Sequence, residues 1–163
     1  MKKVFCLLLS AVLLLGLTAC AKPEEKEADA YTYKSGSTVI AVGNEASPIL
    51  EKLGSYLDYD ESSSCFFSGK DKIYVYASLE VRTYPENGKD YVYMLRLLDD
   101  TVATQEGIRI GSSRSDVTKA YGDAHKQTAN SLIYKGGDMY LEIFFSGDTV
   151  NEIQYQHAYV QEK

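Results

Sequence analysis

The segment from Ile108 to Gly122 (IRIGSSRSDVTKAYG) constrains the fold of this chain more than any other stretch. It combines a strand-like start, a turn at Gly111, a short helix and a glycine stop. A weaker copy, VIAVGNEASPILEKLG, runs from Val39 to Gly54, and ten residues separate its two glycines as well. The recurrence predicts that one structural unit is used twice.

The second of the two expected helices has the better-defined start. Ser113 and Asp116 form a capping box, in which the hydroxyl and the carboxylate satisfy free helix amides reciprocally. Val117 and Tyr121 belong to its buried stripe. The first helix, expected over residues 45–53, has no capping box, and its Pro48 is tolerated because it lies in the first turn.

Antiparallel strands are expected to follow each helix, because turn residues divide short segments rich in β-branched and aromatic side chains. In the first unit, a polar loop over 55–64 precedes strands at 65–67, 73–77, 79–84 and 90–98, with an Asn-Gly turn at residues 87–88. In the second unit, a polar loop to residue 130 precedes strands at 132–134, 139–145 and 150–155. Strands at residues 39–42 and 108–110 lead into the two helices.

The two units match beyond their helices. Residues 66–71 correspond to 133–138, and residues 79–81 correspond to 141–143, in the same order along the chain. Shared β-hairpin composition is the alternative explanation. We predict an α+β fold of two tandem β-α-β-β-β repeats, at residues 31–102 and 103–163, that form an antiparallel sheet with short helices on one face.

Residues 1–19 have the pattern of a signal peptide that directs a bacterial lipoprotein. Lys2 and Lys3 precede an apolar segment that is too short to be a comfortable membrane span, and the segment ends in Leu-Thr-Ala-Cys at Cys20. This ending resembles the lipobox, in which the cysteine is lipidated and becomes the new N-terminus. An ordinary signal peptide with an incidental cysteine is the alternative.

Residues 20–30 would then carry the lipidated cysteine and a disordered tether, because they are charged and lack large apolar side chains. Removing residues 1–19 takes two of 17 basic residues, which leaves 15 against 23 acidic residues and a net charge of -8. No cluster of Lys and Arg suggests a nucleic-acid partner. We expect an extracytoplasmic protein that is held at the cell membrane through lipid on Cys20.

The sequence offers little that indicates catalysis. His125 and His157 have no potential ligands at metal-binding spacing, and no P-loop, dinucleotide or Gly-x-Ser-x-Gly motif occurs. Cys65 follows a serine and precedes two phenylalanines, and we expect it to be a buried small side chain. The acidic residues 58–61 are interpreted as a solvated loop, with a calcium site as the alternative. We therefore expect no catalytic residues, no cofactor and no metal site.

The repeat, a capped helix of the form Gly-Ser-Ser-Arg-Ser-Asp-Val…Tyr-Gly followed by antiparallel strands, resembles a known small unit. It is similar to the helix-plus-meander unit of the BamE/SmpA-like outer-membrane-assembly lipoproteins, and in tandem it resembles the β-lactamase inhibitory protein architecture. It looks most like uncharacterised tandem-repeat lipoproteins of gut clostridia. The resemblance covers residues 39–155 and implies one curved sheet with the helices on its convex side.

Alternation along the strands suggests where a partner would bind. Ile73, Val75, Leu79 and Val81 share one parity, as do Met139, Leu141, Ile143 and Phe145, and both sets suit burial under the helices. The opposite parity carries the candidate partner-binding residues Tyr74, Tyr76, Arg82, Tyr84, Tyr140 and Phe144, together with Glu80 and Glu142. The facing of Tyr91 and Tyr93 stays open, because Leu95 and Leu97 share their parity.

A helix-free sheet face that carries tyrosine, phenylalanine and a few charges has the composition of a recognition surface. We therefore expect a non-catalytic module that binds a protein or an envelope polymer. Cross-strand aromatic pairing that only stabilises the sheet is the alternative interpretation of this face. A structural or self-associating role in envelope assembly, and a small-ligand or ion-binding role, are the alternative functions; the oligomeric state is open.

Overall fold

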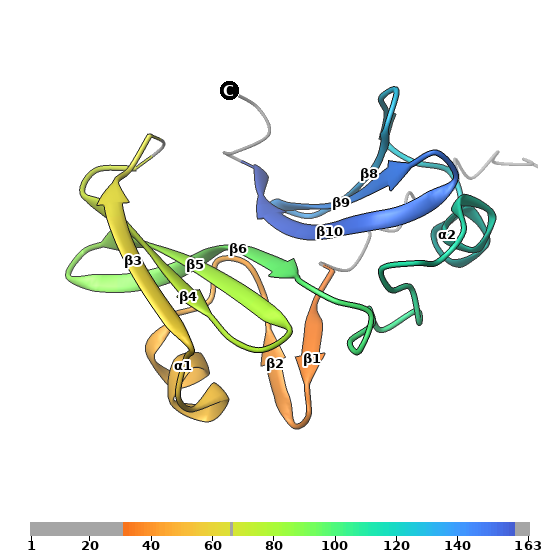
Figure 1. Ribbon diagram of the computed structural model, residues 1–163. Coiled ribbons are helices and arrows are strands. Elements are labelled where there is room, and N and C mark those ends of the chain that lie inside the picture. The colour runs from red at the N-terminus through yellow and green to blue at the C-terminus, as the bar shows by residue number, and fades with distance from the viewer. Residues whose placement is uncertain (1–30, 66, 159–163) are drawn as a thin grey trace, which may run out of the picture.

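The structure, a computed structural model, describes residues 31–65 and 67–158. One eight-stranded antiparallel sheet organises this part of the chain, in the order β3-β4-β5-β6-β10-β9-β8-β7 (Figure 1). Its strands are β3 (Asp58–Ser63), β4 (Lys70–Val75), β5 (Leu79–Glu86), β6 (Lys89–Leu97), β7 (Lys126–Gln127), β8 (Ser131–Gly136), β9 (Met139–Ser146) and β10 (Thr149–His157). The expected α+β fold with an antiparallel sheet is confirmed.

Two helices and a small hairpin complete the described fold. The hairpin consists of β1 (Tyr33–Ser35) and β2 (Thr38–Ile40), and the helices are α1 (Ser47–Leu53) and α2 (Arg114–Tyr121). In Figure 1 the two ends of the sheet rise on the same side, while α1 and the hairpin lie below it. The signal peptide, Cys20 and the tether that were expected from the sequence lie outside the described residues.

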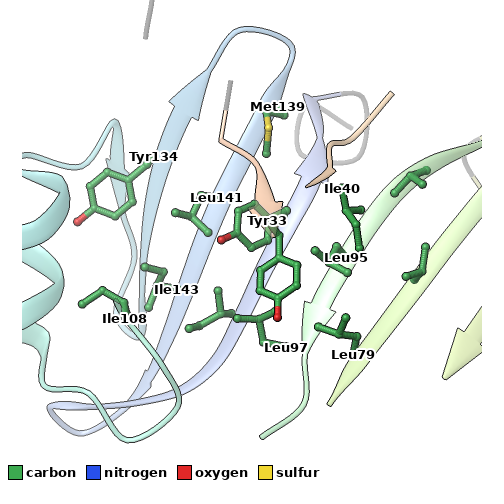
Figure 2. Close-up of a cluster of buried hydrophobic side chains, with 14 of the residues drawn as sticks. Tyr33, Ile40, Leu79, Leu95, Leu97, Ile108, Tyr134, Met139, Leu141 and Ile143 are labelled. Atoms are coloured by element: carbon green, nitrogen blue, oxygen red, sulfur yellow. The ribbon is translucent and has the colours of Figure 1, made fainter. Parts of the chain in front are cut away.

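The largest cluster of buried hydrophobic side chains, which we call the main core, lies between the sheet, the hairpin and both helices. Leu79 and Leu95 from the first half of the chain meet Leu141 and Ile143 from the second half (Figure 2). At the junction of the halves, β6 pairs with β10, so that Leu97 is the partner of Ile153. We call the side of the sheet that faces this core the core face, and the other side the opposite face.

The helix boundaries follow the chemistry of their ends. The capping box of α2 is confirmed: Ser113 Oγ accepts the amide of Asp116 at 3.1 Å, and Asp116 Oδ2 accepts the amide of Ser113 at 3.2 Å. Helix α1 begins two residues later than expected and has no side-chain cap at Ala46. Gly54 and Gly122 end the two helices at φ of 78° and 72°, where a β-carbon would be strained.

The predicted order of strands around each helix is partly wrong. Residues 108–110 form no strand, and β2 pairs with β1 and not with the large sheet. Instead, each helix is followed by four strands, because the supposed polar loops contain β3 and β7 at the two edges of the sheet. Edge strands that face water need no apolar side chains, so hydrophobic alternation in their sequence is weak.

Two further expectations about the first half are wrong. Cys65 and Phe67 lie in the bend between β3 and β4 and not in a strand, and Phe66 is not among the described residues. Cys65 is also exposed and not buried. The Ser-Cys-Phe-Phe segment resembles a strand by composition, but Cys65 and Phe67 belong to the connection between β3 and β4.

Candidate functional site

Four of the six candidate partner-binding residues share the opposite face of the sheet. Register places Arg82 beside Met94, Met94 beside Gln156, and Gln156 beside Tyr140. The remaining two members of this set, Tyr84 and Phe144, lie on the same face, on β5 and β9.

Tyr74 and Tyr76 do not belong to that face, which corrects the interpretation of strand parity. Tyr74 is the register partner of Val81 and Val75 is that of Glu80, so Tyr74 lies on the core face. Tyr76 is itself buried in the main core. The parity changes because the tight β4–β5 connection pairs even-numbered with odd-numbered residues, which counting along the chain does not reveal.

A β-bulge decides the facing of Tyr91 and Tyr93. The register between β5 and β6 shifts by one residue between Arg82 and Thr83. Beyond the bulge, Val92 lies in the main core, whereas Tyr91 and Tyr93 join a second cluster on the opposite face. The extra residue therefore turns both tyrosines away from the side that Leu95 and Leu97 occupy.

The aromatic side chains of the opposite face mostly pack on one another. Tyr84 stacks on Phe67 with ring centroids 3.8 Å apart and an interplanar angle of 14°, and Tyr93 and Met94 complete the cluster. Tyr84 is only 8% exposed and Tyr140 only 6%. An exposed aromatic recognition surface on this face was expected, but these rings offer little contact area to a partner.

A chain of polar side chains crosses the centre of the opposite face. Ser131 Oγ donates to Glu142 Oε1 at 2.8 Å, Gln156 Nε2 donates to Glu142 Oε2 at 3.2 Å, and Arg96 donates to Glu80 Oε2 at 2.6 Å. Gln156 Nε2 also donates to Gln154 Oε1 at 2.6 Å, and Gln154 Nε2 donates to Glu152 Oε1 at 2.5 Å. Glu152 in turn lies 3.5 Å from Arg96, which connects the two groups. The chain links β8, β9, β10, β6 and β5 side by side.

Charge in this chain is compensated locally at β5 and β6. Glu80 accepts from both Arg82 Nε and Arg96 Nη2 at 2.6 Å, and its side chain is 7% exposed. Burial disfavours the charged form of Arg82, but the hydrogen bond and the charge of Glu80 outweigh it and raise the Arg82 pKa. Burial, followed by the nearby Asp71 carboxylate, raises the pKa of Tyr93 to about 12. At neutral pH Arg82 is therefore cationic and Tyr93 is neutral. The ion pair between Arg96 and Glu80 joins β6 to β5.

The exposed aromatic side chains gather elsewhere, at the β3 edge of the sheet. Tyr56 is 49% exposed, Leu57 75% and Tyr59 39%, and the other exposed large hydrophobic residue of the described chain is Val39. Tyr74 lies beside them: its ring centroid is 5.5 Å from that of Tyr56 and 5.2 Å from that of Tyr59. We call Tyr56, Leu57, Tyr59 and Tyr74 the tyrosine edge.

The tyrosine edge contains one residue of the predicted set, Tyr74, in a setting that the sequence did not indicate. Tyr59 and Tyr74 are register partners on β3 and β4, so both rings lie on the core face, at its border. A hollow of about 430 Å³ adjoins Tyr74, between α1 and the β5–β6 turn, and Leu50, Glu51 and Asp90 line it as well. The edge therefore combines exposed rings with a concave neighbour.

Charged side chains lie on both sides of β3 next to the tyrosine edge. Glu61 forms an ion pair with Lys70 at 2.5 Å and accepts the Tyr59 hydroxyl at 3.0 Å. These hydrogen bonds, that of Lys70 first, lower the pKa of the Glu61 carboxyl. Asp58 and Asp60 are exposed, on the other side of β3, beside Val75 and Ile73.

Alternation along β3 separates the carboxylates that a calcium site would need to bring together. Asp58 and Asp60 lie on one side of the strand, and Glu61 lies on the other with Tyr59. No group of three or more His, Cys, Asp or Glu side chains that could hold a metal ion occurs among residues 31–65 and 67–158. The Asp58–Glu61 segment is thus an edge strand in this structure, and the expected loop was wrong.

A signal for this edge was present in the sequence. Leu57, Asp58, Tyr59 and Asp60 alternate between apolar and acidic side chains, which is the period of an amphipathic strand. The run of serines that follows and the density of acidic residues favoured a loop instead. Nothing local indicated that Tyr74 would join it, because that contact depends on the β3–β4 register.

Comparisons with known proteins add little to this geometry. No protein-family model matches the chain, and no curated protein matches it. A solved structure, the uncharacterised protein yfeY from Escherichia coli, is similar over 80% of this chain and 97% of its own, with 13% sequence identity and a TM-score of 0.44. Within the described part of the chain, no helix is long and apolar enough to cross a membrane.

Proposed function

We propose that this chain is a membrane-tethered, extracytoplasmic binding module without catalytic activity, and that it recognises a protein partner through the tyrosine edge. One observation carries this proposal. Of the large hydrophobic side chains exposed in the described chain, three lie at residues 56–59, next to Tyr74. Exposed rings that are grouped in this way offer a large, rigid contact area with polar tips, as protein interfaces commonly do.

The sequence supports the membrane tether. Two lysines, a short apolar segment and Leu-Thr-Ala before Cys20 form the pattern of a lipoprotein signal, and residues 21–30 are suited to a flexible linker. Metabolic labelling with a fatty-acid analogue tests the anchor. Label is expected on the wild type and on Cys65→Ser, and it should be absent from Cys20→Ser. Equal labelling of Cys20→Ser would refute the anchor.

The opposite face is a weaker candidate for the partner site than the tyrosine edge. Tyr84 and Tyr140 are nearly buried, and the ring of Tyr84 packs against those of Phe67 and Tyr93. The alternative interpretation of these residues, aromatic pairing that stabilises the sheet, accounts for their contacts. The guanidinium of Arg82 is likewise occupied by its ion pair with Glu80.

We further propose that the chain arose by tandem duplication of a unit that resembles the one in BamE/SmpA-like lipoproteins, an arrangement that resembles the β-lactamase inhibitory protein architecture. Matching backbone contacts at the two helix starts support this. In the first half, the Gly43 amide donates to Val92 O at 2.7 Å, the Val92 amide donates to Asn44 O at 2.9 Å, and the Ala46 amide donates to Asp90 O at 2.8 Å. In the second half, the Gly111 amide donates to Val150 O, the Val150 amide donates to Ser112 O, and the Arg114 amide donates to Asp148 O, each at 2.8 Å. Strand order supports it as well, because β3 to β6 mirror β7 to β10 about the β6–β10 junction.

Cross-linking on intact cells tests the partner site. A photo-activated amino acid at Leu57 of the full chain is expected to yield a discrete protein adduct, since this side chain is 75% exposed beside the rings. The adduct should be lost when Tyr56→Ala and Tyr59→Ala are added, and circular dichroism should be unchanged because both rings are substantially exposed. The same probe at Val39, which is also exposed but belongs to β2, is the control. An adduct that persists in the double variant, or that Val39 gives equally, would contradict the proposal.

A further inference from the structure

Strand β3 is an open edge of the large sheet. It pairs with β4 on one side only, and all six of its residues, 58–63, are exposed. In an antiparallel pair, alternate backbone amides and carbonyls of an edge strand point away from its neighbour and can pair with another chain. The edge at β7 is only two residues long, so β3 is the longer of the two ends of the sheet.

The acidic side chains of β3 disfavour pairing between two copies of this chain. In an antiparallel pairing centred on the strand, Asp60 of one copy would face Glu61 of the other twice. A shift of the centre to Asp60 would place the two Asp60 side chains opposite each other. Like charges directly across a strand pair are destabilising, so the charge pattern favours a different, basic strand.

The two sides of β3 specify what such a strand would carry. A neighbour on the free edge would alternate its side chains between the Asp58–Asp60 side and the Tyr59 side. Basic side chains would lie beside Asp58 and Asp60, neither of which has an ion pair among the described residues. Asp58 Oδ1 accepts the backbone amide of Tyr59 at 2.9 Å, and an added strand would replace this bond. Apolar side chains would lie against Tyr59, next to Tyr56.

We propose that β3 accepts an extended peptide of its partner as an additional strand, and that this peptide alternates basic and apolar residues. The inference rests on the proposed function, because it names the partner class and the binding mode of the same tyrosine edge. Backbone hydrogen bonds along β3 supply affinity, and the alternating carboxylates and rings supply specificity, as in other cases of β-strand addition.

The test uses the full-length protein in non-ionic detergent and fluorescence anisotropy. The probe is a labelled peptide of about eight residues, a common strand length, in which Lys and Val alternate. One comparison peptide replaces Lys with Glu, and another has alternate backbone amides methylated so that one edge cannot donate hydrogen bonds. The affinity for either comparison peptide is expected to be weaker by about tenfold or more, because each peptide lacks one set of the contacts that the proposal requires.

Variants of the edge complete the test. Tyr56→Ala with Tyr59→Ala is expected to weaken binding by about tenfold. Asp58→Asn with Asp60→Asn should weaken binding several-fold and flatten its salt dependence, because screening then has fewer charges to act on. The matched control is Asp100→Asn with Asp123→Asn, which removes two exposed carboxylates outside β3 and should change nothing.

Some outcomes would overturn strand addition. Equal affinity for the Lys and Glu peptides, equal affinity for the methylated peptide, or binding that is indifferent to the β3 variants would each do so. A second copy of the chain as the occupant, seen as a dimer in light scattering that Tyr56→Ala with Tyr59→Ala disrupts, would also overturn it. If the peptide fails while the Leu57 adduct on cells still depends on the tyrosines, the partner site stands and only the binding mode is refuted.

Discussion

At the scale of single residues, Glu80 is the most consequential side chain of the opposite face. It lies between two guanidinium groups, and its oxygens accept from Arg82 and Arg96 at the same distance of 2.6 Å. Arg96 also approaches Glu152 at 3.5 Å, which connects the ion pair to the glutamine chain of β10. A nearly buried carboxylate of this kind stabilises the fold mainly because its removal would leave Arg82 without its ion-pair partner and Arg96 with only the longer contact to Glu152.

We therefore expect Glu80→Ala to lower the free energy of unfolding by about 2 kcal/mol, below the range for fully buried pairs because both arginines are partly exposed. Urea denaturation measures the change. Glu61→Ala removes another ion-paired carboxylate that is exposed, and its effect should be much smaller. If the two variants are equally stable, the Glu80 cluster contributes no more than a surface pair.

At the scale of elements, the two helices are similar in length but differ in the chemistry of their N-termini. Helix α2 has eight residues and a complete capping box, whereas α1 has seven residues and no side-chain cap. Isolated helices of this length are unstable in water, so both depend on burial of Val117 or Ile49 in the core. The cap of α2 adds to this, because the Ser113 hydroxyl and backbone amide lower the pKa of the Asp116 carboxyl.

Ser113→Ala is expected to lower stability by about 1 kcal/mol. It should also return the Asp116 pKa towards its ordinary value of 3.8, which carboxyl NMR measures. Because the folded pKa lies below the unfolded one, the stabilisation by Asp116 is complete above pH 3.8 and is lost as the pH falls through the folded value.

The variant should therefore lose less stability than the wild type between neutral and acidic pH. Ser47→Ala, an exposed serine at the first position of α1, serves as the control and should leave stability nearly unchanged. An unaltered Asp116 pKa in Ser113→Ala would show that the capping box is not formed in solution.

At the scale of the whole molecule, the two halves share one core and are joined through the sheet. Ile153 is fully buried at the β6–β10 junction, opposite Leu97, and both belong to the same cluster as Val81 and Leu141. Neither half by itself would bury this apolar surface. The halves are therefore expected to unfold together and not one after the other.

Ile153→Ala is expected to lower the free energy of unfolding by about 2–5 kcal/mol, since it leaves a cavity in the shared core. Hydrogen exchange should show an equal loss of protection for slowly exchanging amides of β5 and β9, which belong to different halves. Val39→Ala, on an exposed side chain, is the control and should change stability by less than about 0.5 kcal/mol. A loss confined to β9 would indicate two independent folding units.

The sequence predicted those elements whose signal is local. The capping box at Ser113, the glycine stops, and the buried parity of β9 all follow from neighbouring residues, and each is present. Strands β3 and β7 were missed because an edge strand in water needs no hydrophobic pattern. The candidate site could be predicted only in part: four of its six residues share a face, but Tyr84 and Tyr140 are nearly buried there and Arg82 is paired with Glu80.

What the sequence determined by itself about this protein is part of its set of elements: two short helices of related design, one of them with a capping box, and strands rich in tyrosine. Only the tertiary structure decided which side of the sheet each tyrosine faces. The β4–β5 register and the bulge at Tyr93 of β6 each shift the alternation by one residue, and a shift of one residue moves a side chain to the other face. For that physical reason Tyr74 lies with Tyr56 and Tyr59 at an open edge, where the sequence had not placed it.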